Sequence, residues 1–393
     1  MPSSASASDR GLKITVQTAP YRLVIVQPAL NALSETFIRA HAERLPARVT
    51  VVHGDPAQIG DEPVLSQSLW PRGWRKVWRV AAGRPDKWET RQAYLKVLRG
   101  VQPHAVLAEY GHLGAGLVEP CRLARVPLVV HFHGCDASRR AILEAYAEDY
   151  RRLFEGAAAV VAVSRAMQAK LVSLGAPEQK VHYNPYGVDC SVFTGANPRE
   201  APPVFLAVGR FVEKKAPHLT LLAFARAFAE RPEARLRMIG EGPLLGVCHQ
   251  LADGLGISEA VEFLGPEPHA VVQKEMRAAR AFVQHSIEAS DGDCEGTPVS
   301  VLEASASGLP IVSTRHAGIP DVVVDETTGL LVAERDVSGM ARQILRLVED
   351  RNLASRFGEA GRKRIMAEFS MERSIRHLWS IIENCIHIVK SCS

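Results

Sequence analysis

The chain has no apolar run long enough for a transmembrane helix, although 47% of its 393 residues are hydrophobic. Its first residues, MPSSASASDRGLK, lack the apolar core of a signal peptide, and we expect them to form a short disordered leader. The seven cysteines are scattered without a CxxC pair. This spacing argues against a zinc site or a disulfide framework and favours a reducing compartment, so we expect a cytoplasmic protein.

A strong charge imbalance is also lacking. The formal net charge is only +4, so bulk electrostatics do not indicate a nucleic-acid partner. No G-x-G-x-x-G follows the first predicted strand, which disfavours an NAD-dependent oxidoreductase. The chain is too long for one ordinary core and suits two domains.

Short β-branched runs alternate with longer helical stretches, which is typical of a doubly wound α/β architecture. The pattern predicts strands at 23–27, 48–54, 105–110, 127–134 and 158–164, and then at 204–210, 236–242, 261–265, 281–286, 310–314 and 329–332. A stretch rich in Pro, Gly and Asn, 183–203, separates the two series and reads as a linker. Two Rossmann-like domains should therefore face each other across a cleft, where ligands bind beyond the carboxyl ends of the strands.

We divide the chain into an N-terminal domain at 1–190, a linker at 191–203 and a C-terminal domain at 204–370. Residues 371–393 should form a helix that returns to the N-terminal domain. Trp379 and the pair Ile381–Ile382 would supply its packing surface.

Two glutamates stand eight residues apart in the segment 291–323. Glu295 precedes a predicted helix that begins near Pro298 and Val299, and Glu303 lies just over one turn inside it. The free N–H groups at the start of that helix suit a diphosphate. Two carboxylates beside such a pocket can accept hydrogen bonds from sugar hydroxyls.

A second candidate segment is AVGRFVEKK at 207–215. A predicted strand ends near Gly209, which allows close backbone approach. Arg210 and Lys215 follow on the turn into a helix, and two cations at this spacing can hold a diphosphate leaving group.

Together, GRFVEKK, IGEGPL, EFLG, the paired glutamates and GLPIVST resemble the retaining glycosyltransferase family 4, which has the GT-B fold. The resemblance runs over nearly the whole chain from about residue 22. The motifs SETFI (34–38), HFHGCDAS (131–138) and DGDCEGTP (291–298) are similar to the bacterial exopolysaccharide and colanic-acid branch of that family.

The resemblance implies specific roles. Arg210 and Lys215 would neutralise the donor diphosphate, Glu295 would hold hydroxyls of the donor sugar, and Glu303 would hold the ribose. His133, in the HG-x-D element, would face the donor sugar from the other domain, unless it is a structural histidine at a strand end. The expected catalytic set is His133, Arg210, Lys215 and Glu295. The remaining expected donor contacts are Gly209, Gly240, Gly242, Leu264, Thr297, Pro298, Val299 and Glu303.

The chain departs from the family pattern in two places. The segment QPALNALSETF lacks the Gly-Gly loop that many members carry after the first strand, and Thr297–Pro298 replaces the commoner aromatic–glycine pair. Asp291 and Asp293 form a D-x-D pair that would suit a hard cation. We expect no metal, because Arg210 and Lys215 already supply the positive charge, and we expect Asp136 to cap a helix.

One segment lies outside these motifs. Residues 70–99 contain four of the five tryptophans and nine Lys/Arg against two acids, a local net charge of +7. Trp70, Trp74 and Trp78 recur every four residues. The segment either docks on an anionic membrane surface or packs its tryptophans into the N-terminal core.

The sequence thus predicts a retaining, metal-independent glycosyltransferase with no cofactor beyond its nucleotide-sugar donor. The acceptor would be a sugar or a lipid-linked sugar, and the enzyme would be cytoplasmic or peripheral on the inner face of the membrane. A nucleotide-sugar 2-epimerase of the same fold and a non-catalytic nucleotide-sugar-binding subunit remain alternatives. No covalent nucleophile is evident, so transfer would proceed by front-face displacement within one ion pair.

Overall fold

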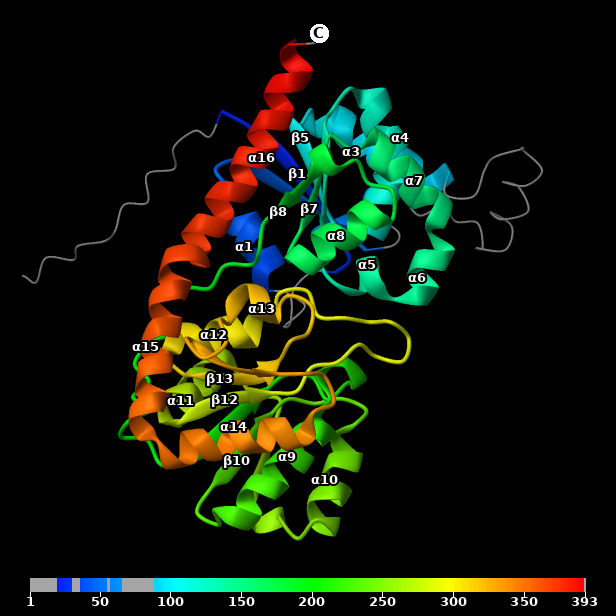
Figure 1. Ribbon diagram of the computed structural model, residues 1–393. Coiled ribbons are helices and arrows are strands. Elements are labelled where there is room, and N and C mark those ends of the chain that lie inside the picture. Colours follow the sequence, from blue (N-terminus) through cyan, green and yellow to red (C-terminus); the bar gives the residue numbers. More distant parts are fainter. Residues whose placement is uncertain (1–19, 30–35, 55–56, 66–87, 392–393) are drawn as a thin grey trace, which may run out of the picture.

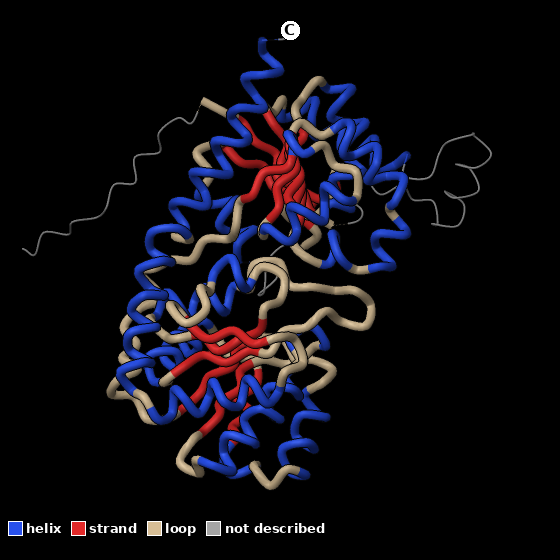
Figure 2. Tube along the Cα trace, in the orientation of Figure 1, coloured by secondary structure: helices blue, strands red, loops and turns tan. Residues whose placement is uncertain are grey.

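The computed structural model describes residues 20–29, 36–54, 57–65 and 88–391 and shows two lobes, one above the other (Figure 1). Each lobe holds one β-sheet with helices on both of its faces (Figure 2). The predicted arrangement of two Rossmann-like domains is confirmed.

The N-terminal sheet has the order β4-β3-β2-β1-β5-β6-β7-β8. Its strands are β1 (Arg22–Gln27), β2 (Arg48–His53), β3 (Gln58–Ile59), β4 (Glu62–Pro63), β5 (Ala105–Glu109), β6 (Leu128–Phe132), β7 (Ala159–Ala162) and β8 (Val181–Tyr183). Every neighbouring pair in the run β2-β1-β5-β6-β7-β8 is parallel. The short strand β3 pairs antiparallel with both β2 and β4. Every residue of β5 and β6 is buried, as expected of strands covered by helices on both faces.

Helices that connect these strands cover both faces of the sheet. They are α1 (Thr36–Arg44), α3 (Trp88–Val101), α4 (Gly111–Ala124), α5 (Cys135–Ser138), α6 (Arg140–Ala145), α7 (Ala147–Gly156), α8 (Arg165–Ser173) and the 3₁₀ turn η1 (Glu178–Lys180). Ser164 caps α8 by accepting a hydrogen bond from the Met167 N–H at 3.1 Å.

The C-terminal sheet is entirely parallel, with the order β11-β10-β9-β12-β13-β14. Its strands are β9 (Val204–Val208), β10 (Arg235–Ile239), β11 (Val261–Gly265), β12 (Ala281–Gln284), β13 (Ile311–Thr314) and β14 (Gly329–Val332). The strand order reverses between β9 and β12, and such a switch point is where doubly wound sheets bind ligands.

The helices of this lobe occupy both faces of the second sheet. They are η2 (Glu213–Lys215), α9 (Pro217–Glu230), α10 (Leu245–Gly254), η3 (Ser258–Ala260), α11 (His269–Ala278), α12 (Val299–Ser307), α13 (Ile319–Val322), α14 (Val337–Glu349) and α15 (Arg351–Glu368). Gly308 ends α12 in the left-handed conformation at φ 99°, which a glycine adopts without strain.

The last helix, α16 (Met371–Ser391), crosses from the C-terminal lobe and lies along the N-terminal sheet (Figure 1). Its apolar side packs on Leu23, Ile25 and Leu107. The buried residues of that side recur at helical spacing; they are Ile375, Leu378, Ile381, Ile382, Cys385 and Ile386. Trp379 packs against Tyr21 with ring centroids 5.4 Å apart. The predicted return of the final helix is confirmed.

Three strands are absent from the sequence-based prediction. β3 and β4 have two residues each, and β8 ends at the first residue of the stretch that reads as a linker. Segments this short carry too little periodicity to be recognised from sequence.

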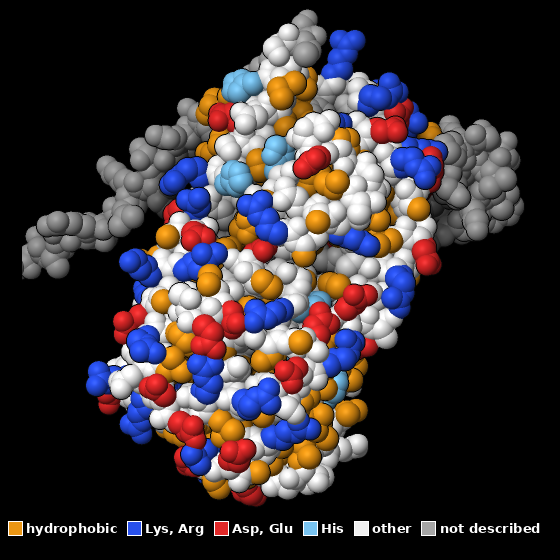
Figure 3. Space-filling model, viewed as in Figure 1, with side chains coloured by type: hydrophobic (Ala, Val, Ile, Leu, Met, Phe, Trp, Pro, Cys, Tyr) orange, Lys and Arg blue, Asp and Glu red, His pale blue; other side chains and the backbone are white. Residues whose placement is uncertain are grey.

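Among the described residues, no helix is long and apolar enough to cross a membrane. Acidic and basic side chains are interspersed over the C-terminal lobe on the face shown in Figure 3. The membrane-docking hypothesis rests mainly on Trp70, Trp74 and Trp78, which lie outside the described residues. The described part of that segment is on α3, where Ala93, Tyr94, Leu95, Val97 and Leu98 are buried.

Candidate active site

The carboxyl ends of the two sheets face each other across the junction of the lobes, and a cavity of about 280 Å³ lies between them. Gly134, Ser138 and Lys170 line it from the N-terminal lobe. Glu295 and His316 line it from the C-terminal lobe. A smaller cavity of about 20 Å³ extends along the end of β9.

The smaller cavity brings together three of the predicted donor residues: Gly209, Arg210 and Lys215. Gly209 directly follows β9, and Lys215 ends η2 just before α9. Arg210 is exposed and forms no ion pair with any side chain that the structure describes. A cation that is free in this way can bind an anionic ligand.

Gly240 and Gly242 follow β10 and allow the neighbouring loop to approach closely. Their φ angles are 136° and 148°, and a Cβ on Gly240 would lie 2.0 Å from the Gly209 carbonyl oxygen. The Phe211 N–H donates to the Glu241 carbonyl at 2.8 Å. The two glycines therefore pack against the backbone of Gly209 and Phe211, which line the smaller cavity.

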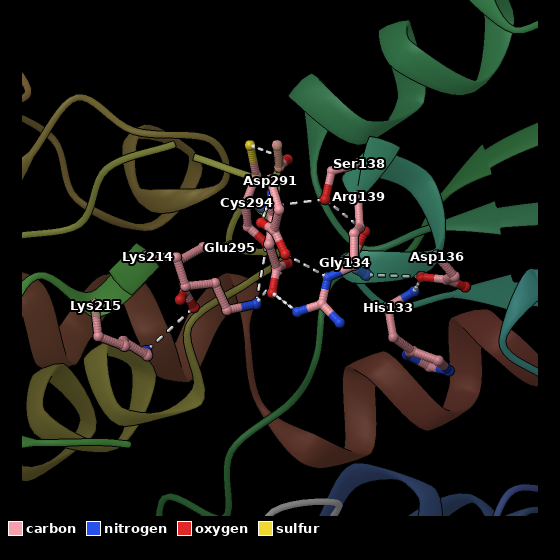
Figure 4. A network of polar contacts seen from close by, with 12 residues as sticks. His133, Gly134, Asp136, Ser138, Arg139, Lys214, Lys215, Asp291, Cys294 and Glu295 are labelled. Atoms are coloured by element: carbon pink, nitrogen blue, oxygen red, sulfur yellow. Dashed lines mark hydrogen bonds and ion pairs between the residues drawn. The ribbon is translucent and has the colours of Figure 1, made fainter. Parts of the chain in front are cut away.

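Glu295 and Lys215 form a buried ion pair, with Oε2 and Nζ 3.1 Å apart (Figure 4). Lys215 Nζ also donates to Gln284 Oε1 at 3.3 Å. The Glu295 side chain is only 6% exposed, and its Oε1 has no hydrogen-bond partner among the described residues. One carboxylate oxygen is thus left to accept a hydroxyl from a ligand.

Burial and ion pairing act in opposite directions on this pair. Burial by itself would raise the pKa of Glu295, but Lys215 and Lys214 more than offset it and lower the pKa to about 2. Burial lowers the pKa of Lys215, against the attraction of Glu295. The site therefore holds a carboxylate that stays ionised next to a desolvated ammonium group.

His316 and Glu334 form hydrogen bonds that hold the backbone of Glu295 in place, and neither residue was predicted from the sequence. His316 Nε2 accepts from the Glu295 backbone N–H at 3.1 Å, and His316 Nδ1 lies 2.6 Å from Glu334 Oε1. This pairing leaves Nε2 free to act as the acceptor. The only available signal was a histidine two residues after the end of β13.

Glu303 lies on α12, where burial raises its pKa to about 8. The attraction of Lys215 opposes this rise but does not cancel it, and His269 Nδ1 lies 3.9 Å from Glu303 Oε1. At neutral pH, Glu303 is therefore largely a neutral carboxylic acid, which can both donate and accept hydrogen bonds. The two paired glutamates thus occupy opposite protonation states.

The remaining predicted residues lie around the start of α12, which begins at Val299 with Pro298 as its N-cap. The Thr297 hydroxyl donates to the Val163 carbonyl of the N-terminal lobe. Leu264 is on β11 and is half-buried. Thr297 therefore contacts the other lobe, while the helix start remains next to Glu295.

A chain of ion pairs joins the lobes beside Glu295 (Figure 4). Arg139 Nε lies 2.9 Å from Asp291 Oδ2, and its Nη2 lies 3.1 Å from Asp293 Oδ2. Lys214 Nζ binds Asp293 Oδ1 at 3.1 Å. The D-x-D pair thus engages Arg139 and Lys214, two residues that sequence reasoning missed, although the double lysine was a visible signal.

His133 lies in a buried cluster of the N-terminal lobe. Its Nδ1 is 2.8 Å from the Tyr186 hydroxyl, and its Nε2 is 2.8 Å from Glu109 Oε2. In Figure 4 the ring points away from Glu295. A contact from the imidazole to a ligand would have to replace one of these two partners.

Asp136 has a different role from the one predicted. It lies inside α5, and its carboxylate accepts hydrogen bonds from the backbone N–H groups of His133, Gly134 and Gly111. Gly111 is the first residue of α4. The carboxylate therefore satisfies a helix N-terminus, but it is that of α4 and not of the helix that follows it in sequence.

Two Rossmann-like domains, a site in the cleft between them and a C-terminal helix that returns to the first domain are the features of the GT-B fold. Residues 34–192 match the family described as Glycosyltransferase Family 4, and residues 193–364 match Glycosyl transferases group 1. The chain belongs to glycosyltransferase family 4 and is of the exopolysaccharide type.

Curated relatives agree with this assignment. The chain is 31% identical over 283 residues to the amylovoran biosynthesis glycosyltransferase AmsK of Erwinia amylovora, covering 70% of this chain and 69% of that protein. It is 29% identical over 329 residues to the putative colanic acid biosynthesis glycosyltransferase WcaL of Escherichia coli K12, covering 81% of each. These relatives favour neither the epimerase nor the non-catalytic alternative.

Solved structures show the same fold at low identity. Anabaena Alr3699/HepE in complex with UDP and glucose has a TM-score of 0.74 at 15% identity, over 93% of this chain and all of that one. Sucrose-phosphate synthase from Thermosynechococcus elongatus has a TM-score of 0.70 at 16% identity, over 94% and 100%.

Proposed function

We propose that this glycosyltransferase moves a sugar from a nucleoside-diphosphate sugar to an acceptor hydroxyl, with retention of anomeric configuration and without a metal ion at the diphosphate. The observation that carries the proposal is the buried pair of Glu295 and Lys215, set beside the free cation Arg210. UDP and glucose in Alr3699/HepE support a donor of this class.

Each charged group has a distinct task in this proposal. Arg210 and Lys215 bind the diphosphate, together with the N–H groups at the start of α12. Glu295 accepts hydroxyls of the donor sugar through its unpartnered Oε1. Glu303, neutral at the pH of the cytoplasm, exchanges hydrogen bonds with the ribose hydroxyls.

Retention follows if the acceptor attacks from the face that the diphosphate leaves. The glycosidic bond to the diphosphate breaks, the acceptor oxygen bonds to the same face of the anomeric carbon, and the departing diphosphate takes the acceptor proton. Lys215 and Arg210 stabilise the charge that develops on the leaving group. In this scheme His133 faces the sugar once a ligand replaces its Tyr186 or Glu109 contact.

A panel of nucleotide sugars tests the proposal. Release of the nucleoside diphosphate identifies the donor, and the anomeric coupling of the product in proton NMR reports its configuration. We expect the anomer of the donor to be kept, and we expect the same rate with a chelator as with manganese. An inverted product, or activity that only manganese restores, contradicts the proposal.

The acceptor we propose is a sugar or a lipid-linked sugar of an exopolysaccharide. The biosynthetic relatives AmsK and WcaL favour such an acceptor. We place the enzyme in the cytoplasm, peripheral on the inner face of the membrane through residues 70–99. Of the described basic residues there, Arg91 pairs with Glu119 at 3.3 Å and Lys96 donates to the Val64 carbonyl at 2.7 Å.

A further inference from the structure

Glu109 lies at the carboxyl end of β5, fully buried and surrounded by histidines. His41, on α1, has Nδ1 2.8 Å from Glu109 Oε1. His131, on β6, has Nδ1 3.6 Å from Glu109 Oε2, and His133 Nε2 is 2.8 Å from the same oxygen. Two segments that are distant in sequence, one with His41 and one with His131 and His133, thus bring imidazoles to both oxygens of one carboxylate.

His131 is the unexplained member of this cluster. Its side chain is 1% exposed, and neither ring nitrogen has a hydrogen-bond partner among the described residues. A buried imidazole without partners is costly, and an ion or a water molecule is the usual explanation.

The charge of the cluster also favours a cation. Glu109 is 0% exposed, and its carboxylate is surrounded by His41, His131 and His133. A buried carboxylate needs a compensating positive charge. A divalent ion would provide that charge and also satisfy His131.

We propose that His41, Glu109 and His131 bind a divalent transition-metal ion, with zinc the best match, as a structural centre of the N-terminal domain. One ligand atom from each of the three residues lies within 4.8 Å of the other two. Zinc–nitrogen and zinc–oxygen bonds place tetrahedral ligands about 3.3 Å apart. His41 Nδ1 is 2.8 Å from Glu109 Oε1, and His131 Nδ1 is 3.6 Å from the other carboxylate oxygen, Oε2, so binding an ion through Oε1 requires only a small shift of these side chains.

The donor set distinguishes this ion from magnesium or calcium. Two imidazoles and one carboxylate suit zinc and its neighbours, whereas hard cations prefer oxygen ligands alone. Metal ligands bind in their deprotonated forms, so binding of the ion would release protons to solvent. His133 would then orient the carboxylate through Oε2, as outer partners of metal ligands do.

The centre belongs to the N-terminal domain and is independent of the proposed sugar transfer, whose cations Arg210 and Lys215 belong to the other domain. Its test therefore uses metal content and stability. We expect the full-length protein, purified without chelator, to carry about one zinc per chain by mass spectrometry. For protein produced in metal-depleted medium, zinc should raise the unfolding temperature by several degrees, whereas magnesium should not. Cobalt should give the visible absorption of a tetrahedral site.

His131→Leu is the decisive variant. Leucine fills a similar volume, and because His131 makes no hydrogen bond to a described residue, the metal-free variant should melt close to metal-free wild type. It should lose the bound zinc and the zinc-dependent rise in unfolding temperature. His249→Gln, at an exposed histidine of α10, should behave as wild type in both assays.

Two results would overturn the proposal. The first is wild-type protein that contains no metal, shows no zinc-dependent rise in unfolding temperature and gives no cobalt spectrum. That result would mean that the histidines and Glu109 form a hydrogen-bonded cluster with an internal water molecule. The second is His131→Leu that keeps its metal, which would place the ion elsewhere. If His131→Leu does not fold, Glu109→Gln, which keeps the shape and removes the charge, must lose the metal instead.

Discussion

At the scale of single residues, the site depends on how burial and charge divide the two glutamates. Lys215 lies against Glu295 and keeps it ionised, whereas burial outweighs the attraction of Lys215 at Glu303 and holds that residue neutral. Glu295 can therefore only accept hydrogen bonds, whereas Glu303 can also donate one.

Lys215→Ala should lower kcat/KM for sugar transfer, because it removes a preorganised cation from the leaving diphosphate. The expected loss of transition-state stabilisation is about 2–4 kcal/mol. Arg210→Ala should act in the same direction. Steady-state kinetics with the identified donor measures both. Lys363→Ala, at an exposed residue of α15, serves as the control. Wild-type kinetics in Lys215→Ala would show that the diphosphate binds elsewhere.

Glu303 predicts a pH dependence of stability. Its pKa is about 8 in the folded protein and 4.5 ordinarily, so its contribution is fully present below pH 4.5 and is lost as the pH rises toward 8. The loss should be on the order of a few kcal/mol. Glu303→Gln imitates the protonated acid and should therefore lose less stability over that range.

Urea denaturation without nucleotide, at about pH 5 and about pH 8, measures this difference. Glu259→Gln, at an exposed glutamate of η3, should keep the wild-type dependence. Equal pH dependence in wild type and Glu303→Gln would mean that Glu303 is ionised in the folded protein.

At the scale of elements, the loop after β12 and the short helix α5 form a latch between the lobes. Arg139 joins Asp291 and Asp293, and the Arg140 N–H donates to the Asp291 carbonyl at 2.9 Å. Because the latch lies next to Glu295, it should help to exclude water from the cleft.

Arg139→Gln should therefore increase hydrolysis of the donor relative to transfer, severalfold, since a partly exposed ion pair contributes about 1 kcal/mol. The ratio of free sugar to transferred sugar measures it. Arg151→Gln removes an exposed ion pair to Glu148 within the same lobe and should leave the ratio unchanged. An unchanged ratio in Arg139→Gln would mean that the latch does not control access of water.

The helix α16 supports the N-terminal sheet through side chains such as Leu378, which is fully buried. Leu378→Ala should lower the free energy of unfolding by about 2–5 kcal/mol. Ile388 lies on the same helix but is 63% exposed, so Ile388→Ala should change stability by less than about 0.5 kcal/mol. Chemical denaturation compares the two, and equal effects would argue against packing by this helix face.

At the scale of the whole molecule, the uneven charge distribution predicts behaviour on membranes. The net charge of the chain is +4, while residues 70–99 alone carry +7. We expect binding to anionic vesicles that weakens as salt rises, and no binding to neutral vesicles. Co-sedimentation measures it. Lack of binding at low salt would mean that the enzyme does not dock on membranes and that its acceptor is free in solution.

Much of the architecture follows from the sequence because its signals are local. All strands except β3, β4 and β8 read as β-branched runs between helical stretches, and α16 reads as an apolar stripe. Pro298 and Glu295 mark the start of α12 within a few residues. Periodicity and turn chemistry act over such short distances, so one segment suffices to predict one element.

The tertiary structure decided the states and partners of the side chains. It pairs Arg139 with Asp293, turns His133 toward Glu109, and brings His41 and His131 to one buried carboxylate. Desolvation and charge act through space between segments that are far apart in sequence. For that reason the sequence indicated Arg210, Lys215 and Glu295, which line the two cavities, whereas their partners and the protonation of Glu295 and Glu303 depended on the folded chain.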